Sequence, residues 1–278
     1  MAKFVSSRNS DIVSNSSNAV VMGLSKDGGL FTPDSIDVKL DLRSLLSLSY
    51  IELASVILKA VFSDIDEKDL KIIAEGAYTG TFDTPEVTPL KKVGEDYFLE
   101  LWHGPTCAFK DVALTLLPRL LTKCYSLENI EKKVVILTAT SGDTGKAALE
   151  GFKDVDNVYI KVLYPKGLVS LTQERQMVTT LGKNTEVISV KGNFDDCQRI
   201  VKNILEGNNE FHKIQLSSAN SINIGRLVPQ VVYYFKAYID LVNGKEIELG
   251  DKVDYIVPTG NFGDILAGYF AKLLGLPV

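Results

Sequence analysis

Short runs of β-branched and other apolar residues alternate with longer amphipathic stretches from about residue 94 onward. The short runs lie at 97–102, 134–138, 158–164, 186–190, 213–216 and 253–258. Apolar residues recur at helical spacing in 112–125, from 144, and in 171–181, 195–206, 224–242 and 265–274. Strands that alternate with helices of this length are typical of a parallel sheet covered by helices. The pattern therefore predicts an α/β region of parallel strands with flanking helices.

The first ninety or so residues follow a different pattern. Turn-forming residues, including DGGLFTP at 27–33, precede two helix-like stretches at 42–63 and 66–79. A TFDTP turn at 81–85 separates this part from the regular alternation. We therefore predict a mainly helical N-terminal domain at residues 1–93 and an α/β region at residues 94–278.

Composition and charge argue against several classes of protein. The chain has 278 residues, 45% of them apolar, and a formal net charge of −5. An acidic chain without a basic run is unsuited to sequence-independent nucleic-acid binding, and no uncharged apolar run is long enough to span a membrane. Three cysteines without CxxC spacing and two scattered histidines argue against a disulfide scaffold and a metal centre. We therefore expect a cytoplasmic protein without a nucleic-acid partner, a membrane partner or a metal.

The sequence LTATSGDTGKAALEGF at 137–152 raises the question of which ligand its glycine loop binds. A P-loop would need Gly at position 140 and Ser or Thr at position 147, where the chain has Thr140 and Ala147. No GxGxxG sequence follows an expected strand, which disfavours a nicotinamide dinucleotide fold. A strand, a loop of small residues and a helix start remain, and this arrangement binds an anion such as a phosphate or a carboxylate.

Three segments of the chain could be explained by a single ligand. LWHGPTCAFKD places Lys110 at a helix start, TSGDTG is the first glycine loop, and PTGNFGD at 258–264 is a second one. Burial at a helix start favours the nucleophilic form of an amine, and glycines let a backbone approach a phosphate closely. Pyridoxal 5'-phosphate needs a lysine, a phosphate loop and a second loop for the carboxylate of an amino acid. The alternative for GNFGD is an ordinary turn between a strand and a helix.

Six ordered segments of the chain resemble one enzyme family. HGPTCAFKD, TATSGDTGKAA, SANSINIGR and PTGNFGDILAG are similar to motifs of threonine synthase, as are the N-terminal GLSKDGGLFTP and the later YPKGLVSLTQERQM. The resemblance runs from about residue 18 to the last residue. It implies the pyridoxal-phosphate fold type II, which is tryptophan-synthase-β-like, and the conversion of O-phospho-L-homoserine and water to L-threonine and phosphate.

The resemblance also assigns roles to residues. Lys110, from the family's FKD sequence, would carry the cofactor as a Schiff base and act as the base at Cα. The cofactor phosphate would lie in the loop of Gly260, Asn261, Phe262, Gly263 and Asp264. The substrate carboxylate would be bound by Ser141, Gly142, Asp143 and Thr144, with Asp143 also near the cofactor. The substrate phosphate would be bound by Lys166, Ser170, Asn220, Ser221, Asn223 and Arg226.

Some of these assignments have alternatives. Asn223 could instead cap a helix, since Asn is a favoured N-cap, and Arg226 could form a surface ion pair. A phospho-lyase of the same fold would release 2-oxobutyrate from the same substrate, and a non-catalytic α/β module would bind a nucleotide at TSGDTGK. The sequence does not distinguish a monomer from a homodimer.

The last residues of the chain bear on its extent. Gly275, Leu276, Pro277 and Val278 follow a helical stretch, and Gly and Pro at these positions are helix-stop signals. In the family that the chain resembles, further chain follows and supplies the residue that faces the ring nitrogen of the cofactor. We therefore expect a fragment that is incomplete at its C-terminal end and inactive on its own.

Overall fold

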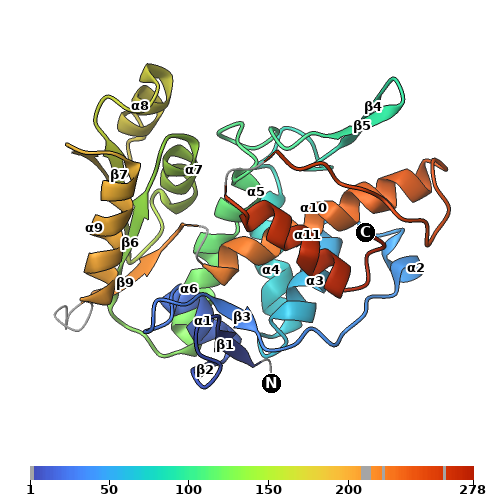
Figure 1. Cartoon of the computed structure of the whole chain (residues 1–278), viewed down its shortest axis with the longest axis horizontal. Helices are drawn as coiled ribbons and strands as arrows, with labels where there is room; N and C mark the ends of the chain where they lie inside the picture. Colours follow the sequence, from blue (N-terminus) through green and yellow to red (C-terminus); the bar gives the residue numbers. More distant parts are fainter. Residues whose placement is uncertain (1–2, 208–213, 221–222, 259–260) are drawn as a thin grey trace.

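The computed structural model describes residues 3–207, 214–220, 223–258 and 261–278. Figure 1 shows a parallel sheet with its helices in one half of the molecule and a helical half beside it. The candidate site residues belong to segments that meet where these two halves join.

The N-terminal part forms a small sheet and four helices. Strands β1 (Phe4–Ser6), β2 (Val13–Ser14) and β3 (Phe31–Pro33) pair antiparallel in the order β2-β1-β3. The helices are α1 (Ser16–Met22), α2 (Leu42–Leu45), α3 (Tyr50–Val61) and α4 (Glu67–Tyr78). The helix expected at 42–63 is thus two helices, because Ser49 and Glu52 form a capping box that starts α3 anew.

A two-stranded hairpin and two short helices follow. Strands β4 (Leu90–Val93) and β5 (Asp96–Leu99) are antiparallel, so the domain boundary predicted at 93/94 falls inside their turn. The single helix expected at 112–125 is wrong, because α5 (Asp111–Leu114) and α6 (Leu117–Leu127) are separate. Pro118 lies in the first turn of α6, where its missing N–H costs no hydrogen bond.

The four-stranded sheet confirms the predicted parallel α/β architecture, although the run expected at 97–102 belongs to the antiparallel hairpin as β5. Its strands are β6 (Lys133–Ala139), β7 (Val158–Pro165), β8 (Thr185–Val190) and β9 (Ile214–Ser218), all parallel in the order β8-β7-β6-β9. The helices that connect these strands are α7 (Asp143–Phe152), α8 (Leu171–Val178) and α9 (Phe194–Glu206). Parallel strands need such helices on both faces, because neither face can remain in water.

Alternate residues of the strands belong to two separate cores. Val134 and Ile136 of β6 pack in the large core that includes α6 and α7. Leu137 and Ala139 point to the opposite face, into a smaller core with Cys197 of α9. A strand with both faces buried reads as a nearly continuous apolar run, which is why β6 and β7 were predictable from the sequence.

The long helix α10 (Ile224–Asn243) lies at the centre of the helical half, against α3, α5 and α11 (Gly263–Leu273). Its residues are buried on almost every side; Tyr233, Phe235 and Tyr238 are among the most buried side chains of the described chain. A helix that is apolar around its circumference is typical of a buried position.

The strand predicted at 253–258 is wrong. The segment is extended, with alternating side chains, but it pairs with no strand among the described residues. Tyr255 packs on Tyr234 of α10 and donates a hydrogen bond to its carbonyl (2.8 Å), while Ile256 is 97% exposed. Packing against a helix therefore produces the same two-residue period as a strand.

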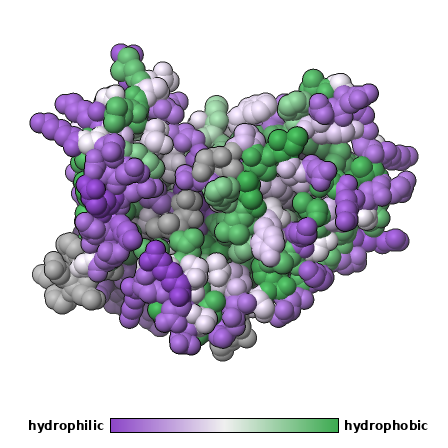
Figure 2. Space-filling view, in the orientation of Figure 1, coloured by the Kyte–Doolittle hydropathy of each residue, from purple (hydrophilic) through white to green (hydrophobic). Residues whose placement is uncertain are grey.

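Apolar side chains gather on the surface near α11 (Figure 2), where Ile265 and Tyr269 are exposed.

Candidate active site

The two neighbours of β6 create a crevice at the carboxyl edge of the sheet. The chain runs from β6 to β7 on one side, whereas β9 lies on the other side, so the loops after β6 and β9 diverge from this point. Ligands of open α/β sheets bind at such switch points. The Asn220 amide, just after β9, accepts a hydrogen bond from Ala139 N (3.2 Å) and donates one to Ala139 O (2.8 Å). Asn220 thus fastens the two strand ends together.

The loop after β6 is organised by a threonine. The Thr140 hydroxyl accepts hydrogen bonds from the N–H groups of Gly142 (3.0 Å) and Gly145 (2.9 Å). Gly142 precedes α7 with φ +154°, a conformation that residues with a Cβ rarely adopt. Thr144 N donates to Asp143 Oδ1 (2.8 Å), so these N–H groups are used within the loop, and what α7 offers the crevice is the positive end of its dipole.

Lys110 enters the crevice from the start of α5. Its side chain is only 15% exposed, and Nζ lies 4.1 Å from the centre of the Phe109 ring. Nζ also donates to Asp143 Oδ2 at 2.6 Å. The lysine predicted from FKD is therefore drawn inward and is joined to the loop after β6.

Asp111 is a buried residue of this region that the sequence analysis missed. Its carboxylate accepts hydrogen bonds from Thr106 N (2.7 Å) and Thr106 Oγ1 (2.6 Å), and burial raises its pKa. These bonds close the loop between the two residues, where Cys107 has φ +56°. A residue other than glycine at this φ is strained, and the Asp111 contacts hold it there. An acid directly after Lys110 in a first helical turn was the available signal.

A cavity of about 340 Å³ brings the candidate residues of four segments together. Its lining includes Lys110, Ser141, Thr144, Asn220, Arg226, Asn261, Gly263 and Asp264, all predicted from the sequence. Phe109, Ala139, Thr140, Phe194, Gln198, Gln230 and Pro258 complete the lining and were not predicted. The cavity does not include Gly142, Asp143, Phe262, Lys166, Ser170 and Asn223, while Ser221 and Gly260 lie outside the described residues.

Arg226 is buried in the wall of the cavity. Its side chain is 5% exposed, Nη1 donates to Ala219 O at 3.0 Å, and Nε has no partner among the described residues. Desolvation lowers its pKa to about 10, and the negative charge of Asp143 opposes this shift. The surface ion pair considered for Arg226 is therefore wrong. A buried cation with an unused donor is costly unless an anion joins it.

Asn223 caps a helix, which is the alternative to phosphate binding that the sequence left open. Its side chain accepts a hydrogen bond from Gly225 N (2.8 Å) at the start of α10. It also donates to Val20 O (2.9 Å), which ties α10 to α1. These contacts leave Asn223 fully buried and directed away from the cavity lining.

The carboxylate of Asp264, at the start of α11, is held by two tyrosines of α10. Oδ1 accepts hydrogen bonds from Tyr233 (2.5 Å) and Tyr234 (2.8 Å). Burial raises the pKa of both phenols, which keeps them as donors. The pair of bonds fixes the N-terminus of α11 against the cavity. Phe262 precedes α11 with its side chain 73% exposed.

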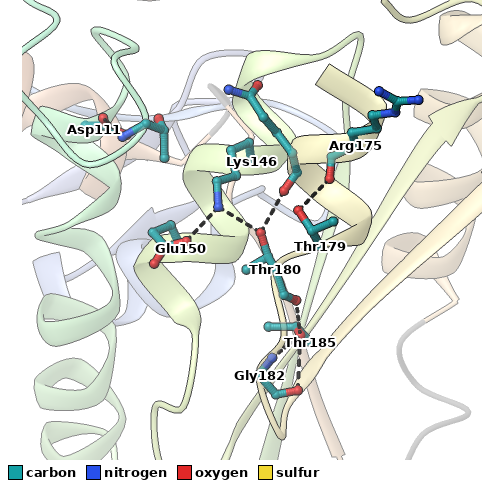
Figure 3. Close-up of polar contacts among 10 residues, drawn as sticks. Asp111, Lys146, Glu150, Arg175, Thr179, Thr180, Gly182 and Thr185 are labelled. Carbon is teal, nitrogen blue, oxygen red and sulfur yellow. Dashed lines mark hydrogen bonds and ion pairs between the residues drawn. The ribbon is translucent and has the colours of Figure 1, made fainter. Parts of the chain in front are cut away.

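Three polar residues predicted or considered as ligands lie elsewhere. Lys166 is exposed, and Ser170 caps α8 by accepting a hydrogen bond from Gln173 N at 3.2 Å. Lys146, the lysine of the rejected P-loop, bonds Glu150 (2.7 Å) and Thr180 (2.9 Å) between α7 and the chain after α8 (Figure 3). Its ammonium group is thus bound to Glu150 of α7 and to Thr180 after α8, which disfavours a nucleotide at this loop.

Comparison with family models identifies the class of enzyme. Residues 3–78 match the threonine synthase N terminus, and residues 81–277 match the pyridoxal-phosphate dependent enzymes. The chain belongs to the pyridoxal-phosphate dependent enzyme family. The family and fold inferred from the sequence motifs are thereby confirmed.

The relatives of this pyridoxal-phosphate dependent enzyme include several threonine synthases. The chain is 42% identical to that of Saccharomyces cerevisiae, over 94% of this chain and 53% of the yeast protein. It is also 42% identical to that of Pseudomonas aeruginosa, over 99% of this chain and 58% of the relative. The structure of PLP-bound threonine synthase from Brucella melitensis superposes with a TM-score of 0.88 at 41% identity, covering 100% of this chain and 59% of that one. The chain thus spans little more than half the length of these relatives.

The cavity residues fit the cofactor of this family. Lys110 Nζ provides the amine, and the N-termini of α7 and α11 provide the positive ends of two separate helix dipoles. Arg226 lines the cavity, so its guanidinium group supplies a positive charge for an anionic ligand. A volume of about 340 Å³ lies within the range of small-ligand pockets.

No described helix is long and apolar enough to cross a membrane.

Proposed function

We propose that this protein is a threonine synthase, which converts O-phospho-L-homoserine and water to L-threonine and phosphate with pyridoxal phosphate. One observation carries the proposal. A single lysine, Lys110, shares a cavity with two helix N-termini and with the buried Arg226. A substrate with an amine, a carboxylate and a phosphate needs this combination, and relatives 42% identical are named threonine synthase.

Each charged end of the substrate has a candidate site in the cavity. We assign the substrate carboxylate to Ser141 and Thr144 at the start of α7, whose hydroxyl groups and helix dipole favour an anion. The cofactor phosphate belongs to the start of α11, at Asn261 and Gly263. Arg226 is assigned to the substrate phosphate, because a guanidinium binds phosphate oxygens through directed N–H groups.

Lys110 is the residue that moves protons. When bound, pyridoxal phosphate supplies an electron sink for the charge that develops at Cα of the substrate. Lys110 Nζ takes the proton from Cα and returns protons at neighbouring carbons, while Asp143, 2.6 Å away, lies where it stabilises a positive charge on Nζ. The low exposure of Lys110 limits the access of bulk water to these protons.

The product of the full-length holoenzyme tests this proposal; the term holoenzyme denotes the complete natural chain with its cofactor. Incubation with O-phospho-L-homoserine, followed by NMR spectroscopy, is expected to show L-threonine and inorganic phosphate in equal amounts. Lys110→Ala should abolish the reaction, whereas Lys146→Ala, which removes the other lysine near the glycine loop, should retain it. Release of 2-oxobutyrate would instead establish a phospho-lyase. A colourless protein that binds ATP and leaves the substrate unchanged would establish a nucleotide-binding module.

We further propose a cytoplasmic protein that acts as a monomer or a homodimer on a small-molecule substrate. Support for the compartment comes from Cys107, Cys124 and Cys197, which are all free. Proteins of oxidising compartments more often pair their cysteines. Cell fractionation tests the location, and light scattering during size-exclusion chromatography tests the oligomeric state.

A further inference from the structure

Helix α8 covers the outer side of the glycine loop and the start of α7. A Cβ atom at Gly142 would meet the side chain of Gln173, and one at Gly145 would meet Met177. One turn further along, Thr180 accepts a hydrogen bond from Lys146. Figure 3 shows this last contact between α7 and the chain after α8. The chain from Gln173 to Thr180 therefore packs along the chain from Gly142 to Lys146.

The contact between Gln173 and Gly142 is the closest of these. A Cβ at Gly142 would lie 2.4 Å from Cδ of Gln173 and 2.5 Å from each of its amide atoms, Nε2 and Oε1. The whole amide group therefore occupies the space beside the Gly142 α-carbon. Gly142 has φ +154°, and the residue after it begins the helix that points to the cavity.

Gln173 is itself held in place. Ser170 Oγ accepts a hydrogen bond from Gln173 N (3.2 Å) and lies 3.1 Å from Gln173 Oε1. These two contacts orient the amide at the start of α8. Ser170, predicted from the family resemblance to bind the substrate phosphate, thus has a supporting role in this structure, outside the cavity lining.

We propose that Gln173 is a positioning residue for the carboxylate site. Its amide holds Gly142 in the conformation that places Ser141 and Thr144 at the cavity. Gln173 does not line the cavity, so it acts through Gly142 and not by touching the substrate. An uncharged amide suits this place, because the loop already holds one acid, Asp143, which is paired with Lys110, and a second carboxylate would repel the substrate's own. The proposal rests on the proposed function, since it assigns the carboxylate to this loop.

Steady-state kinetics of the holoenzyme with O-phospho-L-homoserine test the proposal. Gln173→Ala is expected to raise KM by about tenfold, the effect of roughly 1.4 kcal/mol of lost binding, with kcat changed by less than about twofold. Gln176→Ala is the matched control, because Gln176 lies on the same helix with an exposed side chain. It should behave as the wild type. Gln173→Met retains the bulk over Gly142 and should raise KM less than Gln173→Ala.

Two further measurements test the proposal independently: the effect of a charge at residue 173, and the energetic coupling between residues 173 and 142. Gln173→Glu should raise KM more than Gln173→Ala, and added salt should reduce the difference, since salt screens charge repulsion. Gly142→Ala displaces the amide, so its effect should be smaller in the Gln173→Ala background than in the wild type. Equal KM values for Gln173→Ala and Gln176→Ala, or additive effects with Gly142→Ala, would overturn the proposal.

The same preparations separate this proposal from the proposed function. The wild-type holoenzyme, as the complete natural chain, must show threonine formation and a cofactor absorbance band near 410–430 nm, about the range expected for a lysine-bound pyridoxal. Loss of either property in the wild type counts against the proposed function. Wild-type turnover with an unaltered KM in Gln173→Ala counts against the positioning role alone.

Discussion

The ammonium group of Lys110 lies 2.6 Å from a carboxylate oxygen of Asp143. The two residues belong to different segments: Lys110 precedes α5, and Asp143 is the first residue of α7. Their contact joins the lysine that we assign to the cofactor with the loop that we assign to the substrate carboxylate. A change at either residue should therefore alter both substrate binding and proton transfer.

Asp143→Asn should reduce kcat/KM by about tenfold while the cofactor remains bound. The substitution preserves the shape of the side chain but removes the charge that stabilises a positive Nζ, a loss of roughly 1–2 kcal/mol. Kinetic assays and the cofactor absorbance of the same sample measure the two effects. Asp195→Asn, which changes an exposed acid of α9, is the control. Unchanged kcat/KM in Asp143→Asn would show that the pair has no part in the reaction.

Arg226→Gln should raise KM for the phosphorylated substrate by about a hundredfold, since a charge-assisted contact in a desolvated site contributes roughly 2–3 kcal/mol. Thermal stability should change little, because the substitution also removes a buried charge with an unpartnered Nε. Arg226→Lys should recover part of the affinity but not the directed N–H geometry. A large fall in melting temperature with normal KM would instead identify a structural arginine.

Gly263→Val should weaken cofactor binding. Gly263 begins α11 and lines the cavity, where a branched side chain would block the approach of a phosphate to the helix N-terminus. Its φ lies outside the left-handed region, so bulk and not backbone strain is the expected cause. Thr144→Ala, at the other helix start, should leave the cofactor bound and weaken the substrate. Fluorescence titration with pyridoxal phosphate measures the affinity for the cofactor, and KM for O-phospho-L-homoserine measures the effect on the substrate. Normal values of both quantities in both variants would contradict the assignments.

The sequence predicted those parts of the fold and site that depend on local pattern. β6 and α10 follow from apolar runs, and Lys110 follows from the motif that contains it. The extended segment at 253–258 was mistaken for a strand, because Tyr255 packs on a helix with the same two-residue period. Contacts between distant residues, such as Asp264 with Tyr233, depend on the packing of α11 against α10 and leave no local signal. Lys166 and Ser170 share a motif with the family but lie outside the cavity lining.

His103 should make stability depend on pH. Its ring contacts Glu100 (2.9 Å) and Asp83 (2.6 Å) while stacking on Trp102, and the hydrogen bond to Glu100, followed by that to Asp83, raises its pKa. A raised pKa means that the protonated ring stabilises the fold fully below pH 6.5, its ordinary value, and that this contribution is lost as the pH rises through the folded value.

The melting temperatures of wild type and His103→Gln test this expectation. Between pH 6 and pH 9, the wild type should lose about 2 °C more than the variant, since a partly exposed ion pair contributes at most about 1 kcal/mol. His103→Gln retains a polar side chain but cannot be protonated. Parallel curves over this pH range would show that the two carboxylates do not bind a charged ring.

The identity of the lysine that carries the cofactor is the most direct test of the account. Borohydride reduction of the yellow holoenzyme, followed by peptide mapping, should place the pyridoxyl label on Lys110. Lys110→Ala should retain its fold by circular dichroism and take no label, because Lys110 lies at a helix start beside a cavity. A label on Lys146 would contradict the account, since it would require that lysine to leave Glu150 and Thr180 and would place the reactive centre on the far side of α7.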